Sequence, residues 1–218
     1  MSLVAMWPVL GMRVQTPAVE LFVPDGEALV HVARLAAQGI YDPQNQYLPR
    51  TPVGGWEDVD PPEAERRFLR YYWAAFADWR PDRWNILLAA KVGSDIVGVQ
   101  EIGAQDFALT RTVSTGSWVG RQYQGAGHGT AMREAVLHLA FAGLGAERAD
   151  TAAWTTNRAS LGVSRALGYR LNGTTTRAAE GRRLEQVNLT LSRSDWRGPS
   201  EGFVIAGLSA EARTMVGA

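Results

Sequence analysis

The stretch Gln124-Gly125-Ala126-Gly127-His128-Gly129-Thr130 decides the fold of this 218-residue chain. Its three glycines stand at alternate positions, where the missing Cβ atoms let the backbone pass very close to a ligand. The residues that follow have the spacing of an amphipathic helix, whose N-terminus offers unpaired N–H groups and the positive end of the helix dipole. The stretch therefore predicts a cradle for a pyrophosphate group.

The spacing of the glycines distinguishes between the classes of cofactor that such a cradle can bind. A G-x-G-x-x-G dinucleotide fingerprint that starts at Gly125 requires glycine at position 130, where the chain has Thr130. Asp150 nevertheless follows at about the distance of the acidic residue in dinucleotide folds, so a nicotinamide-dependent oxidoreductase remains the less favoured alternative. A P-loop is excluded because no Gly-Lys-Ser/Thr follows. The alternative to a ligand site is a glycine-rich turn that only begins a helix and binds nothing.

The composition is that of an ordinary globular domain, with 46% hydrophobic residues, 20% charged residues and a formal net charge of zero. A neutral chain predicts no nucleic-acid partner. The absence of cysteine excludes disulfides, thiolate metal ligands and a cysteine nucleophile. His31, His128 and His138 lack metal-ligand spacing, so we predict no metal site. Without a membrane-length apolar run or a cleavable signal, we predict no membrane partner and a cytoplasmic location.

The pattern of strands and helices predicts one α+β domain, in which helices cover both faces of a mostly antiparallel sheet. Strand signals cover residues 13–23, 84–91, 95–102, 110–119, 148–154, 169–176 and 183–192, and helix signals cover 26–37, 62–78, 127–142 and 157–167. On the helix over 127–142, the spacing predicts that Arg133, Glu134 and His138 point outward. We predict a domain over 1–197, a long acceptor-side loop over 40–61 that carries Tyr41, Tyr47 and Trp56, and a C-terminal tail over 198–218.

Two segments together resemble a known family. Residues 124–129 resemble the Q/R-x-x-G-x-G/A motif of the GNAT superfamily of acyl-CoA-dependent N-acyltransferases. The segment from Asn157 to Tyr169 is similar to the second signature of that family, an Asn followed twelve residues later by the aromatic residue of a Leu-Gly-Phe/Tyr ending. The Asn-x-x-Ser form, the start at residues 16–21 and the Ser-Asp-Trp ending at Trp196 resemble the RimJ/RimL-type branch. The resemblance covers about residues 13–197.

This resemblance implies a GNAT-like sheet with splayed middle strands, the first of them bulged, and a coenzyme A site between them. The pyrophosphate would bind backbone N–H groups of the glycine loop, and the pantetheine arm would pair with the strand before it. Asn157 would also contact the arm, although an Asn at this place is equally suited to cap a helix. The implied coenzyme A residues are Trp118, Val119, Gly120, Gln124, Gly125, Ala126, Gly127, His128, Gly129, Thr130, Asn157 and Ser160.

The resemblance also implies direct transfer in a ternary complex, which requires a base for the amine and an acid for the departing thiolate. Many members place a Tyr seven residues after the Asn as the acid, where this chain has Ser164. In RimL-like members the serine of Asn-x-x-Ser, here Ser160, takes this role, and we rank it ahead of Ser164. Glu101, Glu180 and Glu185 are the candidate bases.

The sequence leaves the two substrates open. Acetyl-CoA is the default donor, and succinyl-CoA is an alternative because its carboxylate needs an arginine or several hydroxyl and amide donors. The acceptor is a primary amine: a protein N-terminus, a lysine side chain or a small amine. The replacement of the usual Tyr by Ser164 also supports a non-catalytic acyl-CoA sensor. A homodimer or higher homo-oligomer is a further prediction, to which the aromatic residues of the 40–61 loop point.

Overall fold

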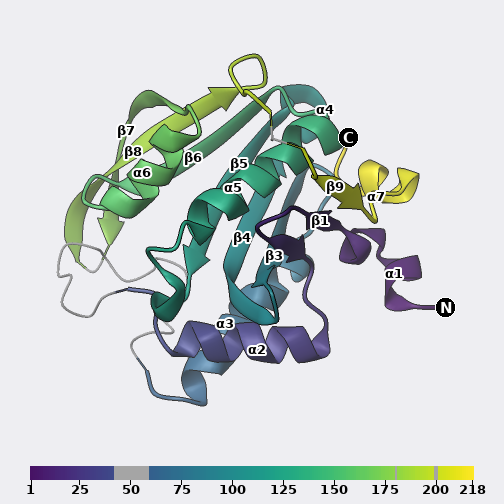
Figure 1. Ribbon diagram of the computed structural model, residues 1–218, viewed down its shortest axis with the longest axis horizontal. Helices are drawn as coiled ribbons and strands as arrows, with labels where there is room; N and C mark the ends of the chain where they lie inside the picture. The colour runs from purple at the N-terminus through teal and green to yellow at the C-terminus, as the bar shows by residue number, and fades with distance from the viewer. Residues whose placement is uncertain (42–58, 180, 199–200) are drawn as a thin grey trace.

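The computed structural model describes residues 1–41, 59–179, 181–198 and 201–218 (Figure 1). Most of the predicted 40–61 loop lies outside these residues, and with it Tyr47, Trp56 and their predicted acceptor-side role. Tyr41 is described. Among the described residues, no helix has both the length and the apolar character needed to span a bilayer.

Within the described residues, nine strands form one sheet in the order β7-β8-β6-β5-β4-β3-β2-β1-β9. All neighbours in this order run antiparallel except β5 and β6, which run parallel. This confirms the predicted α+β class and its mostly antiparallel sheet. The bounds are β1 Arg13–Gln15, β2 Glu20–Phe22, β3 Arg83–Val92, β4 Asp95–Gln105, β5 Thr112–Val119, β6 Arg148–Trp154, β7 Arg170–Ala179, β8 Arg182–Ser192 and β9 Val204–Ala206.

Several of the helices begin at residues whose side chains cap them. Asp25 caps α2 by accepting from the N–H of Ala28 at 3.0 Å, and Asn157 and Ser209 cap α6 and α7 in the same way. The α-helices are α1 Leu3–Met6, α2 Gly26–Ala37, α3 Glu63–Ala77, α4 Phe107–Thr110, α5 His128–His138, α6 Arg158–Ala166 and α7 Ala210–Met215. The tighter and wider turns are η1 Pro8–Gly11, η3 Arg121–Tyr123 and the π-helical η4 Leu139–Gly143.

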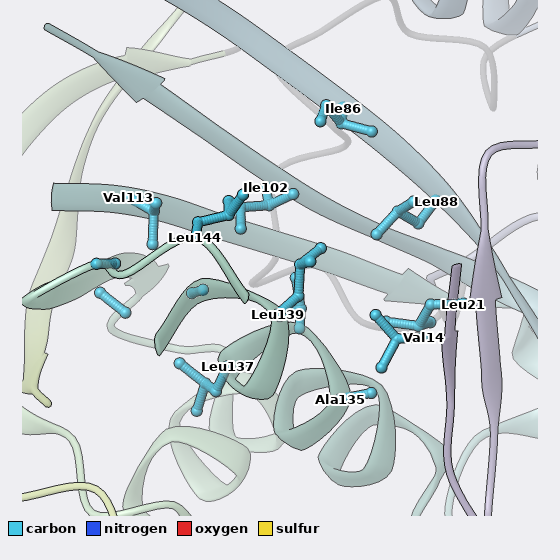
Figure 2. Packing of buried hydrophobic residues seen from close by; sticks show 14 of the residues in the cluster. Val14, Leu21, Ile86, Leu88, Ile102, Val113, Ala135, Leu137, Leu139 and Leu144 are labelled. Atoms are coloured by element: carbon cyan, nitrogen blue, oxygen red, sulfur yellow. The ribbon is translucent and has the colours of Figure 1, made fainter. Parts of the chain in front are cut away.

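Two hydrophobic cores lie on opposite faces of the sheet, because successive strand residues point to opposite sides. On β3, Ile86 and Leu88 face the core under α5, whereas Leu87 and Ala89 face the core under α2 and α3. Figure 2 shows Leu139 directed from the helical segment toward the strands that carry Ile102 and Val113. The central strands are therefore buried on both faces, and α5 packs over β4 and β5 (Figure 1).

The predicted strand over 13–23 is wrong in one respect, because it folds back on itself as the β1–β2 hairpin. Thr16 holds the turn: its N–H donates to Val19 O at 3.0 Å, and its hydroxyl accepts from the N–H of Val19 at 2.9 Å. Pro17 follows and favours the turn, since it has a fixed φ and no N–H to donate to a ladder.

The residues predicted as a C-terminal tail pack against the domain. Strand β9 pairs with β1 and becomes the last strand of the sheet. Helix α7 follows it, Ala212 and Val216 are fully buried, and Val216 O accepts from Trp84 Nε1 at 3.0 Å. The segment therefore extends the sheet and closes one end of the main core, far from the glycine loop (Figure 1).

Candidate active site

The site begins where β5 and β6 separate. The two strands pair over only three positions, Thr112–Ser114 opposite Arg148–Asp150. Strand β5 stays paired with β4 as far as Val119, and β6 stays paired with β8 as far as Trp154. Beyond Ser114 the ladder between β5 and β6 ends. The carbonyls of Thr115 and Gly116 accept from the side chains of Thr151 and Gln100, and the part of β5 that follows, Ser117 to Val119, lines a cavity. This is the splay that the family resemblance implied.

The bulge that the resemblance implied in β5 is not found there. The register of β4 against β5 runs without a shift from Gly98 opposite Val119 to Gly103 opposite Ser114. The shift in this part of the sheet lies between β3 and β4, where Ala90 is opposite Gly98 but Lys91 is opposite Ile96, so that Val97 of β4 is the extra residue. The splay in this chain thus arises from the short β5–β6 pairing, and β5 itself remains regular.

A cavity of about 950 Å³ extends from the splay to the glycine-rich loop. Its volume falls in the range of cofactor and small-molecule sites. All the predicted coenzyme A residues line it except Gly120 and Ala126. Gly120 instead packs against α2, where a Cβ at this position would lie 2.5 Å from a methyl of Leu35. The cavity is lined by Ile40, Tyr41, Ser117, Trp118, Val119, Tyr123, Gln124, Gly125, Gly127, His128, Gly129, Thr130, Arg133, Thr155, Thr156, Asn157, Arg158, Ala159, Ser160 and Val163.

The glycine loop has the backbone conformation that a pyrophosphate cradle needs. Gly125 and Gly127 have φ values of 80° and 84°, a left-handed conformation that side chains disfavour. A Cβ at either position would meet no protein atom within 4 Å, so the space beside both glycines is open. Gly127 is also the residue before α5, whose first N–H groups have no partner within the helix. These residues fit a diphosphate group.

Gln124 fixes the entry to this loop. Its side-chain Nε2 donates to Ile40 O at 2.7 Å and to Val119 O at 2.8 Å. The amide therefore ties the end of β5 to the chain that follows α2. Gln124 therefore holds the glycine loop in place, and its side-chain amide donates both of these hydrogen bonds within the protein.

The Asn157 region supplies the opposite wall. Asn157 Oδ1 accepts from the N–H of Ser160 at 3.1 Å, so the Asn caps α6 and lines the cavity at the same time. Ser160 is also in the wall. Ser164 is only 1% exposed, does not line the cavity, and donates from its hydroxyl to Ser160 O at 3.1 Å. The geometry thus gives Ser160 access to a ligand and engages Ser164 within its own helix.

Of the candidate bases, Glu101 lies deepest in the protein. It stands on β4 opposite Gly116 of β5, and its carboxylate lies over the open face of that glycine. It accepts hydrogen bonds from the hydroxyl of Tyr71 on α3 and from the side chain of Asn85 on β3. Burial raises the pKa of the Glu101 carboxyl above its usual 4.5, and the two hydrogen bonds partly oppose that shift. Its side chain is therefore oriented and held in a weakly solvated place.

The other two candidate bases are placed differently from Glu101. Glu185 is exposed near the start of β8, and its carbonyl accepts from the N–H of Thr155 at 3.1 Å, which brings its backbone next to the cavity wall. Glu180 lies outside the described residues.

The raised pKa of Glu101 predicts a pH dependence of folding stability. Between 4.5 and the folded-state pKa, the folded protein binds more protons at this site than the unfolded chain, so stability falls as pH rises. We expect Glu101→Gln to remove this pH-dependent loss of folding stability. The loss amounts to about 1.4 kcal/mol for each unit by which the pKa of Glu101 is raised. Urea unfolding of both proteins from pH 4.5 to 8 measures it, and parallel curves would contradict the assignment.

Sequence reasoning placed Arg133 on the solvent side of α5, and this prediction is wrong. Arg133 is 3% exposed and lines the cavity. Helix α5 is enclosed by the sheet and by α6, so its buried surface is wider than one apolar stripe. The spacing of apolar residues in α5 did not indicate that Arg133 would be buried. Arg158 was also missed, although its place directly after Asn157 gave a sequence signal for a contact with the ligand.

The comparisons with known proteins agree with this geometry. A family model described as an acetyltransferase (GNAT) domain matches residues 29–170. The match covers more than half of the chain and includes the splayed strands, the glycine loop and Asn157. The chain belongs to the GNAT acetyltransferase family.

Solved structures of the RimJ/RimL type share its fold. Mycobacterium smegmatis RimJ in complex with CoA-disulfide is 20% identical with a TM-score of 0.67, over 85% of this chain and 88% of that chain. RimL, the ribosomal L7/L12 α-N-protein acetyltransferase in complex with coenzyme A, is 14% identical with a TM-score of 0.63, over 81% and 95%. The spermidine/spermine N-acetyltransferase SpeG from Vibrio cholerae is 13% identical with a TM-score of 0.59, over 81% and 95%.

Proposed function

We propose that this GNAT acetyltransferase transfers an acyl group from acyl-CoA directly to a primary amine in a ternary complex. The observation that carries the proposal is one continuous cavity that joins the glycine cradle at the start of α5 to the splay between β5 and β6. The cradle suits the pyrophosphate of the donor, and the open strand edges suit its amide-bearing arm. The absence of cysteine in the chain is consistent with transfer that does not pass through a thioester on the protein.

The proposed chemistry uses groups on the two sides of β5. The amine gives up a proton to Glu101, directly or through water, and its nitrogen attacks the thioester carbonyl. As the new C–N bond forms, the C–S bond breaks, and the Ser160 hydroxyl passes its proton to the departing thiolate while it takes up the remaining excess proton from the attacking nitrogen, so that the serine ends neutral. Tyr71 and Asn85 hold the Glu101 carboxylate in place through hydrogen bonds. A base whose pKa is raised by burial accepts a proton more readily at neutral pH.

The roles of the two serines predict unequal effects of removing them. We expect Ser160→Ala to lower kcat about 10-fold to 100-fold, the low end for loss of a general acid, because a serine hydroxyl is a weak acid. Ser164→Ala should change kcat less than about twofold, since its hydroxyl is engaged with Ser160 O and lies outside the cavity wall. Steady-state kinetics with thiol release as the readout tests both. Equal losses in the two variants would remove Ser160 from the proposed role.

For the acceptor we propose an amine at a protein N-terminus or on a small polyamine. The support is the shared fold with RimL, described as a ribosomal protein α-N-acetyltransferase, and with SpeG, described as a spermidine/spermine N-acetyltransferase. Membership of the family supports acetyl-CoA as the donor, whereas the buried Arg133 in the cavity wall supports succinyl-CoA.

Two measurements test the proposal. Thermal shifts with coenzyme A, acetyl-CoA, succinyl-CoA and NAD identify the ligand, because a ligand that binds the folded state raises Tm according to its affinity. A larger shift with NAD than with every coenzyme A species would contradict the proposal. Thiol release across a panel of amines then tests catalysis. Tight acyl-CoA binding without turnover on any amine would favour the non-catalytic sensor.

A further inference from the structure

Arg133 occupies an unusual position for a cation. It lies on the second turn of α5, is 3% exposed, and spans the two strands just beyond their last paired positions. One terminal nitrogen, Nη1, donates to Thr151 Oγ1 on β6 at 3.2 Å, and Nη2 donates to Ser117 Oγ on β5 at 3.3 Å. The guanidinium therefore lies at the splay itself, on the face of the sheet that α5 covers.

Its charge is not neutralised by the described part of the protein. Among the described residues, no ion pair includes Arg133, and its Nε is buried without a hydrogen-bond partner. Burying an unpaired cation is costly, and a buried donor without an acceptor adds to that cost. A neutral side chain of similar size would avoid both costs. The arrangement therefore indicates that an anion completes the site when the ligand binds.

The pyrophosphate of the donor is assigned elsewhere, to the N-terminus of α5. Arg133 lies six residues after Gly127, about 9 Å farther along the helix axis. Its two hydrogen-bond partners fix it beside β5 and β6, where the acyl end of the donor lies if the arm follows the splay. An anionic group that pairs with Arg133 at this place would therefore have to come from the acyl end of the donor.

We propose that Arg133 binds the carboxylate of a dicarboxylic acyl group, so that the preferred donor is a dicarboxylic acyl-CoA of the succinyl type. This inference rests on the proposed function of the same cavity. Guanidinium and carboxylate form strong charge-assisted hydrogen bonds. Ser117 assists, because its oxygen accepts from Arg133 and leaves its O–H free to donate to the carboxylate. Acetyl-CoA has no group to neutralise the cation.

The test compares succinyl-CoA with butyryl-CoA, a neutral donor of the same carbon number. We expect wild type to prefer succinyl-CoA at least about tenfold in kcat/KM. Arg133→Gln should lower kcat/KM for succinyl-CoA about 30-fold and change that for butyryl-CoA less than about threefold, in line with loss of one buried ionic contact. Arg133→Lys should recover part of the preference. Arg165→Gln, an exposed arginine of α6 outside the cavity wall, is the matched control and should change neither donor.

Two results would overturn the inference: a wild-type preference for butyryl-CoA, or parallel losses for both donors, which would make Arg133 a structural link between β5 and β6. If Arg133→Gln fails to fold, Arg133→Met fills the same space with an unbranched side chain. Calorimetric binding of both donors to wild type and variant repeats the comparison without turnover. A charge-specific loss of binding in an inactive protein would support the role of Arg133 even if the transfer reaction itself were disproved.

Discussion

Replacing Gly127 with valine is expected to weaken coenzyme A binding more than about 100-fold, a loss of about 2.7 kcal/mol or more. Gly127 has a φ of 84° and stands directly before α5, at the centre of the proposed pyrophosphate cradle. A branched side chain there would occupy the open space that the ligand needs and would push the phosphates away from the helix N-terminus. Isothermal titration of coenzyme A measures the loss.

The fold should survive this change. A Cβ at Gly127 meets no protein atom within 4 Å, so the cost comes from the left-handed φ alone, about 1–3 kcal/mol. Gly145→Val is a matched control, because Gly145 has a φ of 73°, an equally open Cβ position and no place in the cavity wall. It should lower Tm by a similar amount and leave coenzyme A affinity unchanged. Normal affinity in the Gly127 variant would contradict the proposed cradle.

The second large effect is expected from Glu101→Gln, which should lower kcat about 1000-fold, within the range for loss of a general base. Glutamine keeps the size of the side chain and still accepts from Tyr71 and Asn85, so the packing around it is preserved. It cannot take a proton from the amine. Coenzyme A affinity should be unchanged, because Glu101 does not line the coenzyme A cavity.

The pH profile separates a catalytic loss from a structural one. In wild type, kcat/KM should rise with pH through the raised pKa of Glu101, and this limb should disappear in Glu101→Gln. Glu185→Gln is the comparison, because Glu185 is the exposed alternative and should retain more than half of the activity. A large loss in Glu185→Gln with near-normal Glu101→Gln would transfer the role of base to Glu185.

Much of the fold was predictable because its signals are local. The caps at Asp25 and Asn157, the glycines of the 124–130 stretch and the apolar strands of the sheet act within a few residues of one another. Predicted helices at 26–37 and 62–78 match α2 and α3 within one residue at each end. The sharp turn at Thr16 and Pro17 was the exception, since it divides one apolar alternation into two short strands.

The roles of single side chains within the site were harder to predict, because helix periodicity describes one contact face and α5 has several. The buried position of Arg133 depends on where β5 and β6 separate, which no spacing in α5 encodes. The pairing of β9 with β1 joins residues almost two hundred positions apart and likewise depends on the assembled sheet.

By itself, the sequence determined the family and predicted the ligand class and the loop proposed to hold the pyrophosphate, because glycine conformation and helix capping are properties of neighbouring residues. Only the tertiary structure decided that Ser160 faces the cavity while Ser164 bonds within its helix, and that Glu101 meets Tyr71. It also decided that Arg133, which has no ion pair with any described residue, lies at the splay. The physical reason is that burial, pKa and charge pairing depend on which distant elements enclose a side chain, and packing alone sets that.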